Sequence, residues 1–184
     1  IDYETATSQT VVFTITDGTA AVTESVVITF TDADEFNVGS VTDSNTGAAN
    51  TMAENVANGA TVGLTAVATD ADGTTNVISY TVTDQSCANV FTVGSSTGIV
   101  AVADNSAIDY ETATSCTVEV TATSTDTSTA ATTFTVAVTD IDEFDVGAPS
   151  DSNSGTNTMA ENVANAATVG VTAVATDADG TTNV

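Results

Sequence analysis

The sequence predicts an all-β protein built from tandem, seven-stranded Greek-key β-sandwiches joined end to end. The first reason is composition: Val, Ala and Ile supply most of the apolar residues and Thr is abundant, and β-branched side chains suit a pleated, half-buried surface. The second is spacing, because short apolar and polar runs are separated by turn signals without helical patterns. The third is a hydrophobic content of 41%, which argues against acidic disorder.

Five runs between residues 61 and 139 are typical of strands, and one of them holds two strands around a Ser-Ser-Thr-Gly turn. Within the run at 116–123, alternate residues from Cys116 to Ala122 share one face, because side chains two apart in a strand point the same way. Weaker signals near 40–56 bring the total to about seven strands, as in a sandwich. The runs are TVGLTAVAT (61–69), NVISYTVT (76–83), VFTVGSSTGIVAV (90–102), CTVEVTAT (116–123) and TTFTVAVT (132–139).

The chain repeats itself with an offset of 107 residues, which becomes 108 across the hairpin before the acidic hexapeptide. This period fits one domain per repeat. We therefore expect residues 1–36 to end one domain, 37–144 to form a complete one and 145–184 to begin the next, as in a window cut from a longer array. The repeated stretches are IDYETATS (1–8 and 108–115), TMAENVAN (51–58 and 158–165) and TAVATDADGTTNV (65–77 and 172–184).

The charge balance excludes several classes of function. The chain has 25 acidic residues, no Lys, Arg or His and a formal charge of −25, so it cannot neutralise nucleic-acid phosphates and is repelled by anionic membranes. No apolar run approaches the length of a membrane span. Catalysis by His or Lys is impossible, and the paired acids lie in linkers rather than in a pocket, so we predict no enzymatic activity. Abundant oxygen ligands favour Ca²⁺ or Mg²⁺ instead.

Four acidic signatures recur in a fixed order along the chain. A single run of this kind is usually a solvated loop, but the ordered set is harder to explain in that way. An EF-hand starting at Asp70 is excluded, because its twelfth position would be Thr81 instead of Glu. The signatures are Ala-Glu-Asn (53–55, 160–162), Asp-Ala-Asp (70–72, 177–179), Asp-Tyr-Glu (2–4, 109–111) and the hexapeptides TDADEF (31–36) and TDIDEF (139–144).

These signatures, in this order and at this period, resemble cadherin-type repeats. Stretches such as AENVANGATVG and TDIDEFDVG are similar to the cadherin-like repeats of very long bacterial surface adhesins. The resemblance covers essentially the whole chain and implies a cadherin- or immunoglobulin-like sandwich in each repeat. It also implies that calcium ions lie at each domain–domain junction.

The resemblance assigns ligands to two junctions. At the second junction it implies Glu54, Asp109 and Glu111 from the middle domain, Asp140, Asp142 and Glu143 from the linker, Asp177 and Asp179 from the next domain, and a carbonyl near Asn183. At the first junction it implies Asp2, Glu4, Asp32, Asp34, Glu35, Asp70, Asp72 and Asn76. Asp126 matches a further acidic position in a late strand, with Asp17 as its approximate counterpart.

The chemistry of calcium supports pooling these groups. Ca²⁺ binds six to eight oxygens at about 2.3–2.6 Å, which no single signature offers. Carboxylates two residues apart in an extended linker point the same way, so Asp140 and Asp142 can face one cluster. The linker departs from the family pattern Asp-x-Asn-Asp-Asn, because Glu143 reaches farther than Asp and Phe144 cannot ligate through its side chain. We expect Phe36 and Phe144 to pack between domains.

The two cysteines, Cys87 and Cys116, lie in the same repeat, and Gln9 stands at the position of Cys116 in the other copy. A pair confined to one copy suggests a disulfide, which fits an extracellular compartment. Two buried free thiols are the alternative.

The sequence therefore predicts a calcium-stiffened structural repeat of an extracellular, cell-surface adhesin or filament, acting as a stiff spacer in cell attachment. Its partners would be adjacent repeats, and its adhesion target is not encoded in this stretch. The alternative is a subunit of a self-assembling filament held by strand addition or lateral contacts as well as calcium. A ligand-binding module would need an exposed aromatic or polar cluster away from the junctions, and the chain offers none.

Overall fold

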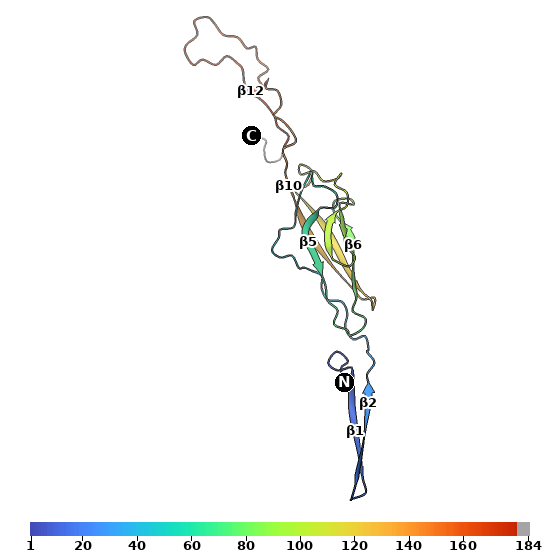
Figure 1. Cartoon of the computed structure of the whole chain (residues 1–184). Coiled ribbons are helices and arrows are strands. Elements are labelled where there is room, and N and C mark those ends of the chain that lie inside the picture. The colour runs from blue at the N-terminus through green and yellow to red at the C-terminus, as the bar shows by residue number, and fades with distance from the viewer. Residues whose placement is uncertain (180–184) are drawn as a thin grey trace.

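The computed structural model describes residues 1–179 and confirms an all-β protein. Twelve strands form four sheets, and the described residues contain no helix, so none of them lies in a helix able to cross a membrane. Figure 1 shows an elongated molecule with a hairpin at the N-terminal end, a sandwich in the middle and the segment after residue 144 at the far end. Asn183, expected to offer a carbonyl at the second junction, lies outside the described residues.

The sandwich consists of two four-stranded sheets that face each other across a common core. The chain crosses between the sheets from β5 to β6, from β6 to β7 and from β8 to β9, which gives the predicted Greek-key arrangement. One sheet has the order β4 (Thr51–Ala53), β10 (Thr129–Thr139), β9 (Ser115–Ser124) and β6 (Ile78–Gln85). The other has the order β3 (Thr42–Asp43), β5 (Thr61–Val67), β8 (Ile99–Val102) and β7 (Phe91–Val93).

The first pass of the chain through the sandwich is divided between the two sheets. Its first part, β3, pairs antiparallel with β5, and its second part, β4, pairs parallel with β10. Counted as passes, the sandwich therefore has the predicted seven strands, although hydrogen bonding defines eight segments from β3 to β10. The division matters for the site, because the parallel pairing carries the end of β4 to the end of β10.

The core follows the alternation predicted from the sequence. In β9 every second residue from Cys116 to Ser124 is buried, and Val118 and Val120 are fully inaccessible to solvent. Val62 and Leu64 of β5 belong to the same core from the opposite sheet. The one buried aromatic hydroxyl is satisfied, because the Ala68 N–H donates to the Tyr80 hydroxyl at 3.0 Å, as a buried polar group requires.

A disulfide joins Cys87, which follows β6, to Cys116 in β9, with a Cα–Cα distance of 5.6 Å. The predicted disulfide is thus present, and the alternative of two free thiols is wrong. Because β6 and β9 are neighbours in one sheet, the bond fastens the loop that leaves β6 to the strand beside it.

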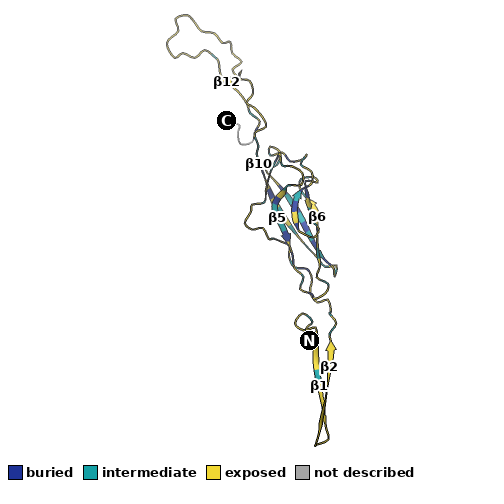
Figure 2. Ribbon diagram, viewed as in Figure 1, coloured by how far each residue is buried: buried dark blue, intermediate teal, exposed yellow. Residues whose placement is uncertain are grey.

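The two flanking segments are mostly exposed, as Figure 2 shows in yellow. Before the sandwich, β1 (Ser8–Thr16) and β2 (Ala21–Thr29) form an antiparallel hairpin that is paired along its full length. After it, β11 (Ser150–Asp151) and β12 (Ala173–Val174) make a short two-stranded contact. Neither segment packs a core of its own among residues 1–179.

Candidate metal centres

The linker that follows β10, residues 140–144, is held at its first residues by the buried carboxylate of Glu54. Because β4 runs parallel to β10, Glu54 at the end of β4 lies beside Thr139, and its N–H donates to the Thr139 carbonyl at 3.2 Å. The Glu54 side chain is only 7% exposed. It accepts the N–H of Tyr110 at 2.8 Å and that of Ile141 at 2.6 Å, so it ties the Asp-Tyr-Glu loop to the linker.

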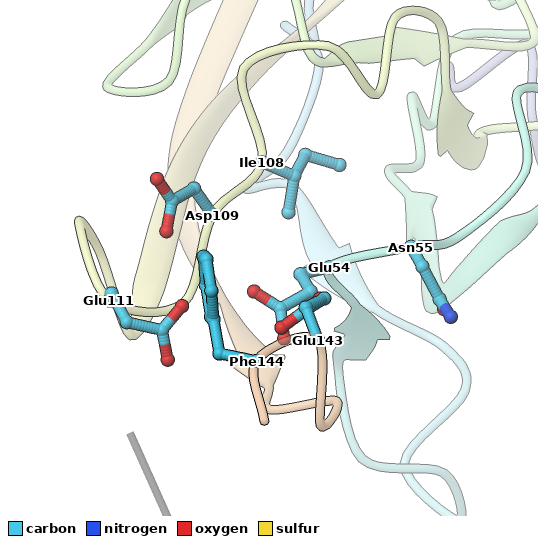
Figure 3. Close-up of a pocket in the computed structure, with 7 residues that line it drawn as sticks. All are labelled: Glu54, Asn55, Ile108, Asp109, Glu111, Glu143 and Phe144. Atoms are coloured by element: carbon cyan, nitrogen blue, oxygen red, sulfur yellow. The ribbon is translucent and has the colours of Figure 1, made fainter. Parts of the chain in front are cut away.

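Four predicted ligands converge at this point. Glu54, Glu111, Asp140 and Glu143 each offer a carboxylate oxygen, and these oxygens all lie within 4.8 Å of one another. They come from three separate stretches of sequence. A cavity of about 220 Å³ opens beside them, lined also by Ile108, Asp109 and Phe144. Figure 3 shows the carboxylates of Glu54 and Glu143 meeting near the ring of Phe144, while Asn55 points away.

The electrostatics of this group are unfavourable without a cation. Loss of hydration, followed by the negative charges of Glu54 and Glu111, raises the pKa of Glu143 from 4.5 to about 7. Carboxylates this close cannot all ionise at low cost. Since the sequence contains no Lys, Arg or His, only an added cation or protons can relieve the repulsion.

The far side of this linker is bound by the next Asp-Ala-Asp signature. Asp179 is fully buried and accepts the N–H groups of Glu143 at 2.9 Å and Phe144 at 3.0 Å. Burial works against its ionised form, but these hydrogen bonds prevail and lower the pKa of Asp179. A hydrogen bond with Asp179, burial, and the charges of Asp179 and Asp177 raise the pKa of Asp142. The linker therefore has acidic groups on both sides.

The first junction repeats this arrangement. Asp72 is 1% exposed and accepts the N–H groups of Glu35 at 3.0 Å and Phe36 at 3.2 Å, as Asp179 does for Glu143 and Phe144. It belongs to two groups whose oxygens lie within 4.8 Å, one with Glu4 and Glu35 and the other with Asp34 and Asp126. Burial and the charges of Asp126 and Asp72 raise the pKa of Asp34.

A cavity of about 300 Å³ at the first junction is the counterpart of the one at the second. It is lined by Ile1, Asp2, Glu4, Glu35, Phe36 and Ala71. The first five of these stand at the same positions of the repeat as Ile108, Asp109, Glu111, Glu143 and Phe144. The expected interdomain packing of the two Phe side chains is only partial, because Phe36 remains 47% exposed and Phe144 51% exposed at the cavity walls.

The donor set at both junctions fits a hard divalent cation. Every ligand atom in these groups is a carboxylate oxygen, the type that Ca²⁺ prefers. Around the first junction, Asp32 Oδ1 and Asp70 Oδ2 are buried without a hydrogen-bond partner in the part of the chain that the structure describes. Buried charged oxygens of this kind are costly unless something neutralises them.

Three other predicted ligands accept hydrogen bonds from Thr side chains. Asp2 accepts the N–H of Glu4 and the hydroxyl of Thr5, and Asp109 binds the N–H and hydroxyl of Thr112 in the same way. Asp32 accepts the hydroxyl of Thr74. Asp17 lies in the hairpin turn, where the N–H groups of Thr19 and Ala20 lower its pKa to about 2, so it is placed for the turn and not for the junction.

One contributor was missed from the sequence. The Ser128 hydroxyl donates to Asp126 at 2.8 Å and accepts the N–H of Val38 at 2.8 Å. It therefore connects Asp126 to the start of the sandwich, next to Asp34 and Asp72. The Asp-x-Ser spacing is the only signal for this contact, and it is too common to have been singled out.

Comparison with known proteins decides the fold family. Residues 49–139 match the family model described as "Cadherin domain". This stretch has the fold of a cadherin domain. It begins just before β4 and ends with β10, so the acidic groups lie at the two ends of the cadherin sandwich rather than in its middle. No curated protein matches the chain.

Solved structures with the same fold are cadherin ectodomains. "Protocadherin Gamma B2 extracellular cadherin domains 3-6" is 20% identical with a TM-score of 0.68, covering 98% of this chain and 45% of that one. "Crystal Structure of Mouse Cadherin-23 EC22-24" is 23% identical with a TM-score of 0.67, covering 98% and 56%. "Crystal Structure of Mouse Protocadherin-24 EC1-3" is 18% identical with a TM-score of 0.67, covering 97% of this chain and 58% of that one. At these identities the likeness establishes the cadherin fold, and the chain spans about half the length of these structures.

Proposed function

We propose that this chain is a calcium-stiffened structural segment of an extracellular adhesin or filament. Residues 37–144 form one domain, residues 1–36 end the domain before it, and residues 145–184 begin the domain after it. The observation that carries the proposal is the convergence, at both ends of the cadherin sandwich, of acidic side chains from separate stretches with no basic residue to balance them.

The residues that would hold calcium follow from these groups. At the second junction they are Glu54, Glu111, Asp140 and Glu143, with Asp109, Asp142, Asp177 and Asp179 nearby in the same junction. At the first junction they are Glu4, Asp34, Glu35, Asp72 and Asp126, with Asp2, Asp32 and Asp70 beside them. A bound dication would supply the positive charge that the sequence lacks.

The mechanism is electrostatic. Without a dication, repulsion among the carboxylates opposes docking of the linker, so each junction bends easily. With the repulsion removed, the contacts through Glu54 and Asp179 hold the linker against both neighbours and the chain stiffens. The sandwich itself stays folded in either state, because its core and its disulfide do not involve the acidic groups.

Extracellular placement is supported by two features, the disulfide and the fold. Disulfides persist in oxidising compartments, and this sandwich contains one. Cadherin domains are extracellular modules, and the fold matches theirs. A charge of −25 keeps a rod soluble. The sequences of the repeats resemble those of bacterial surface adhesins. In such an adhesin a stiff spacer would carry an adhesive tip away from the cell.

Calcium titration combined with small-angle X-ray scattering tests the proposal. We expect calcium to bind the wild-type chain, and chelation to shorten the particle and raise its flexibility. Glu54→Gln removes a charge from the four-residue group and should weaken binding at the second junction by roughly tenfold or more. Glu24→Gln, on the exposed hairpin strand β2, is the matched control. An unchanged scattering profile across millimolar calcium would contradict the proposal.

A further inference from the structure

The loop that carries the Asp-Ala-Asp signature of the sandwich ends in a glycine that touches the Asp-Tyr-Glu loop at residues 2–4. A Cβ atom added at Gly73 would lie 2.7 Å from Cδ1 and 2.8 Å from Cε1 of the Tyr3 ring. It would also lie 3.0 Å from Oε1 of Glu4. Carbon atoms in contact lie about 3.5–4.0 Å apart, so no side chain fits between Gly73 and this ring.

The backbone conformation of Gly73 does not explain why a glycine stands there. Gly73 is not among the glycines with positive φ in the part of the chain that the structure describes. An alanine could therefore adopt this backbone without the strain of a left-handed conformation. What excludes a side chain at Gly73 is the close approach of Tyr3 and Glu4.

Two hydrogen bonds accompany the ring contact. The Gly73 N–H donates to Oε1 of Glu4 at 2.9 Å, and the Thr74 hydroxyl donates to Asp32. In both bonds a neutral donor of the loop reaches a carboxylate on the other side of the junction, which strengthens the bond. We name these five residues the clasp: Tyr3, Glu4 and Asp32 on one side, and Gly73 and Thr74 on the other.

The corresponding tyrosine inside the sandwich shows that the ring can serve two neighbours. Tyr110, the counterpart of Tyr3, packs against the core of the sandwich and is still only half-buried. One part of such a ring thus contacts its own domain, and the rest remains available to the loop that follows. The counterpart of Gly73 is Gly180, which lies outside the described residues, but both members of the pair recur in the sequence.

We propose that the clasp is a direct docking surface between the Asp-Tyr-Glu loop and the Asp-Ala-Asp-Gly loop, in which the Tyr3 ring against the Gly73 backbone sets the angle of the first junction. A bound Ca²⁺ does not set this angle by itself, because its coordination geometry is flexible. A ring in contact with backbone atoms is directional and nearly incompressible. Gly73 and Tyr3 are therefore positioning residues, and neither supplies a carboxylate to a cation.

The proposal depends on the proposed function at one point only. A cation would bring Glu4 and Asp72 together by removing their repulsion, and the clasp would then determine the arrangement in which they come to rest. The contact between Tyr3 and Gly73 contains no ion. Its test can therefore give a result whether or not calcium binds.

Quenching of tyrosine fluorescence by acrylamide tests the ring contact in the 184-residue chain. In a Tyr110→Phe background the remaining tyrosines are Tyr3 and Tyr80, and Tyr80 is only 7% exposed, so quenching reports on Tyr3. Gly73→Ala should raise the quenching constant, because the added methyl group pushes the ring out of the clasp. Gly47→Ala is the matched control, since a Cβ atom there would meet nothing within 4 Å.

A double-mutant cycle tests whether this contact controls the junction. Gly73→Ala should raise the calcium concentration at which small-angle scattering shows half-maximal stiffening by at least about twofold, the lower range for residues in contact. In a Tyr3→Ala background the same substitution should have little effect, because the ring that it strikes is gone. Tyr3→Phe should behave as wild type, since the contact atoms are ring carbons. Thermal unfolding checks that the sandwich is intact in each variant.

The outcomes separate this proposal from the proposed function. If calcium stiffens the chain but Gly73→Ala leaves both the quenching constant and the calcium midpoint at their wild-type values, the clasp is overturned and the proposed function stands. Equal effects of Gly73→Ala with and without the Tyr3 ring also overturn it. If no calcium binds and Gly73→Ala still exposes Tyr3 to the quencher, the clasp stands and the proposed function fails.

Discussion

Two copies of nearly the same sequence, one inside the sandwich and one beyond it, show which contacts are local. The side chain of Asp43 accepts the Thr65 N–H at 3.1 Å, and Asp151 accepts the Thr172 N–H at 2.9 Å. Likewise, Asn45 donates to the Gly63 carbonyl at 2.8 Å and Asn153 donates to the Gly170 carbonyl at 2.6 Å. These Asp and Asn contacts form without the rest of a domain.

The strands behave differently in the two copies. In the sandwich, β5 extends over Thr61–Val67, while its counterpart β12 is only Ala173–Val174. The sequences are almost identical, so the difference comes from the neighbours: β5 pairs with both β3 and β8, whereas β12 pairs only with β11 among residues 1–179. The strands β1 and β2 pair along their full length because they are adjacent in sequence and each is the other's partner. Side-chain turns are thus encoded locally, whereas long strands require a partner.

The largest expected effect on the free energy of unfolding comes from truncating the same Met of the repeat in the sandwich, and we compare it with the same change made separately in the C-terminal segment. Met52→Ala should lower the free energy of unfolding of the sandwich by about 2–5 kcal/mol, because Met52 is 4% exposed and its loss leaves a cavity. Met159→Ala, in the same local sequence but 62% exposed, should change it by less than about 0.5 kcal/mol. Urea unfolding of dilute protein measures both. Equal losses from the two substitutions would mean that residues 145–179 belong to the cooperative unit.

A smaller effect is expected from the disulfide, which distinguishes the two hairpins. Cys116 in β9 is bonded to Cys87, while its counterpart in β1 is Gln9. The double variant Cys87→Ala, Cys116→Ala should lower the free energy of unfolding by about 3 kcal/mol, as expected for a closed loop of this length. Urea unfolding with and without reductant measures the loss. Reductant should destabilise wild type and leave the double variant unchanged, and a reductant effect on both would contradict the assignment.

The fold could be predicted from the sequence because its signals are redundant. Alternation in the run at 116–123 gave the buried face of β9, and the repeat placed the acidic signatures in order. The disulfide followed from a comparison of the two copies. Each of these depends on patterns that hold over many residues, so a single local exception does not change the result.

The details of the acidic groups could not be predicted in the same way. Asp2 and Asp109 each accept the hydroxyl of the Thr three residues later, a local competition that composition does not reveal. Asp72 and Asp179 became buried because they accept backbone N–H groups of the preceding linker. Whether a short acidic side chain binds a local or a distant partner depends on the detailed position of the backbone, and a sequence motif does not specify that position.

The smallest expected effect is a pH dependence of linker docking at the second junction, between the sandwich and the segment after residue 144. The pKa of Glu143 is about 7 against an ordinary 4.5, so the docked linker holds a proton that the released linker would lose. Between these two pH values, raising the pH therefore weakens docking, since the proton is lost from the docked state. The groups that face Glu143 are Glu54, Glu111 and Asp179, all negative when ionised.

Without divalent cations, we expect scattering to show a more flexible chain at pH 8 than at pH 5, while the unfolding temperature of the sandwich changes little because its core contains none of these groups. Glu143→Gln should remove much of this dependence, since Gln neither gains nor loses a proton. Glu24→Gln, on the hairpin, should leave the pH dependence intact. If Glu143→Gln and Glu24→Gln behave alike, repulsion at Glu143 does not control the junction, and the contacts of Asp179 with the linker are what hold the two copies in line.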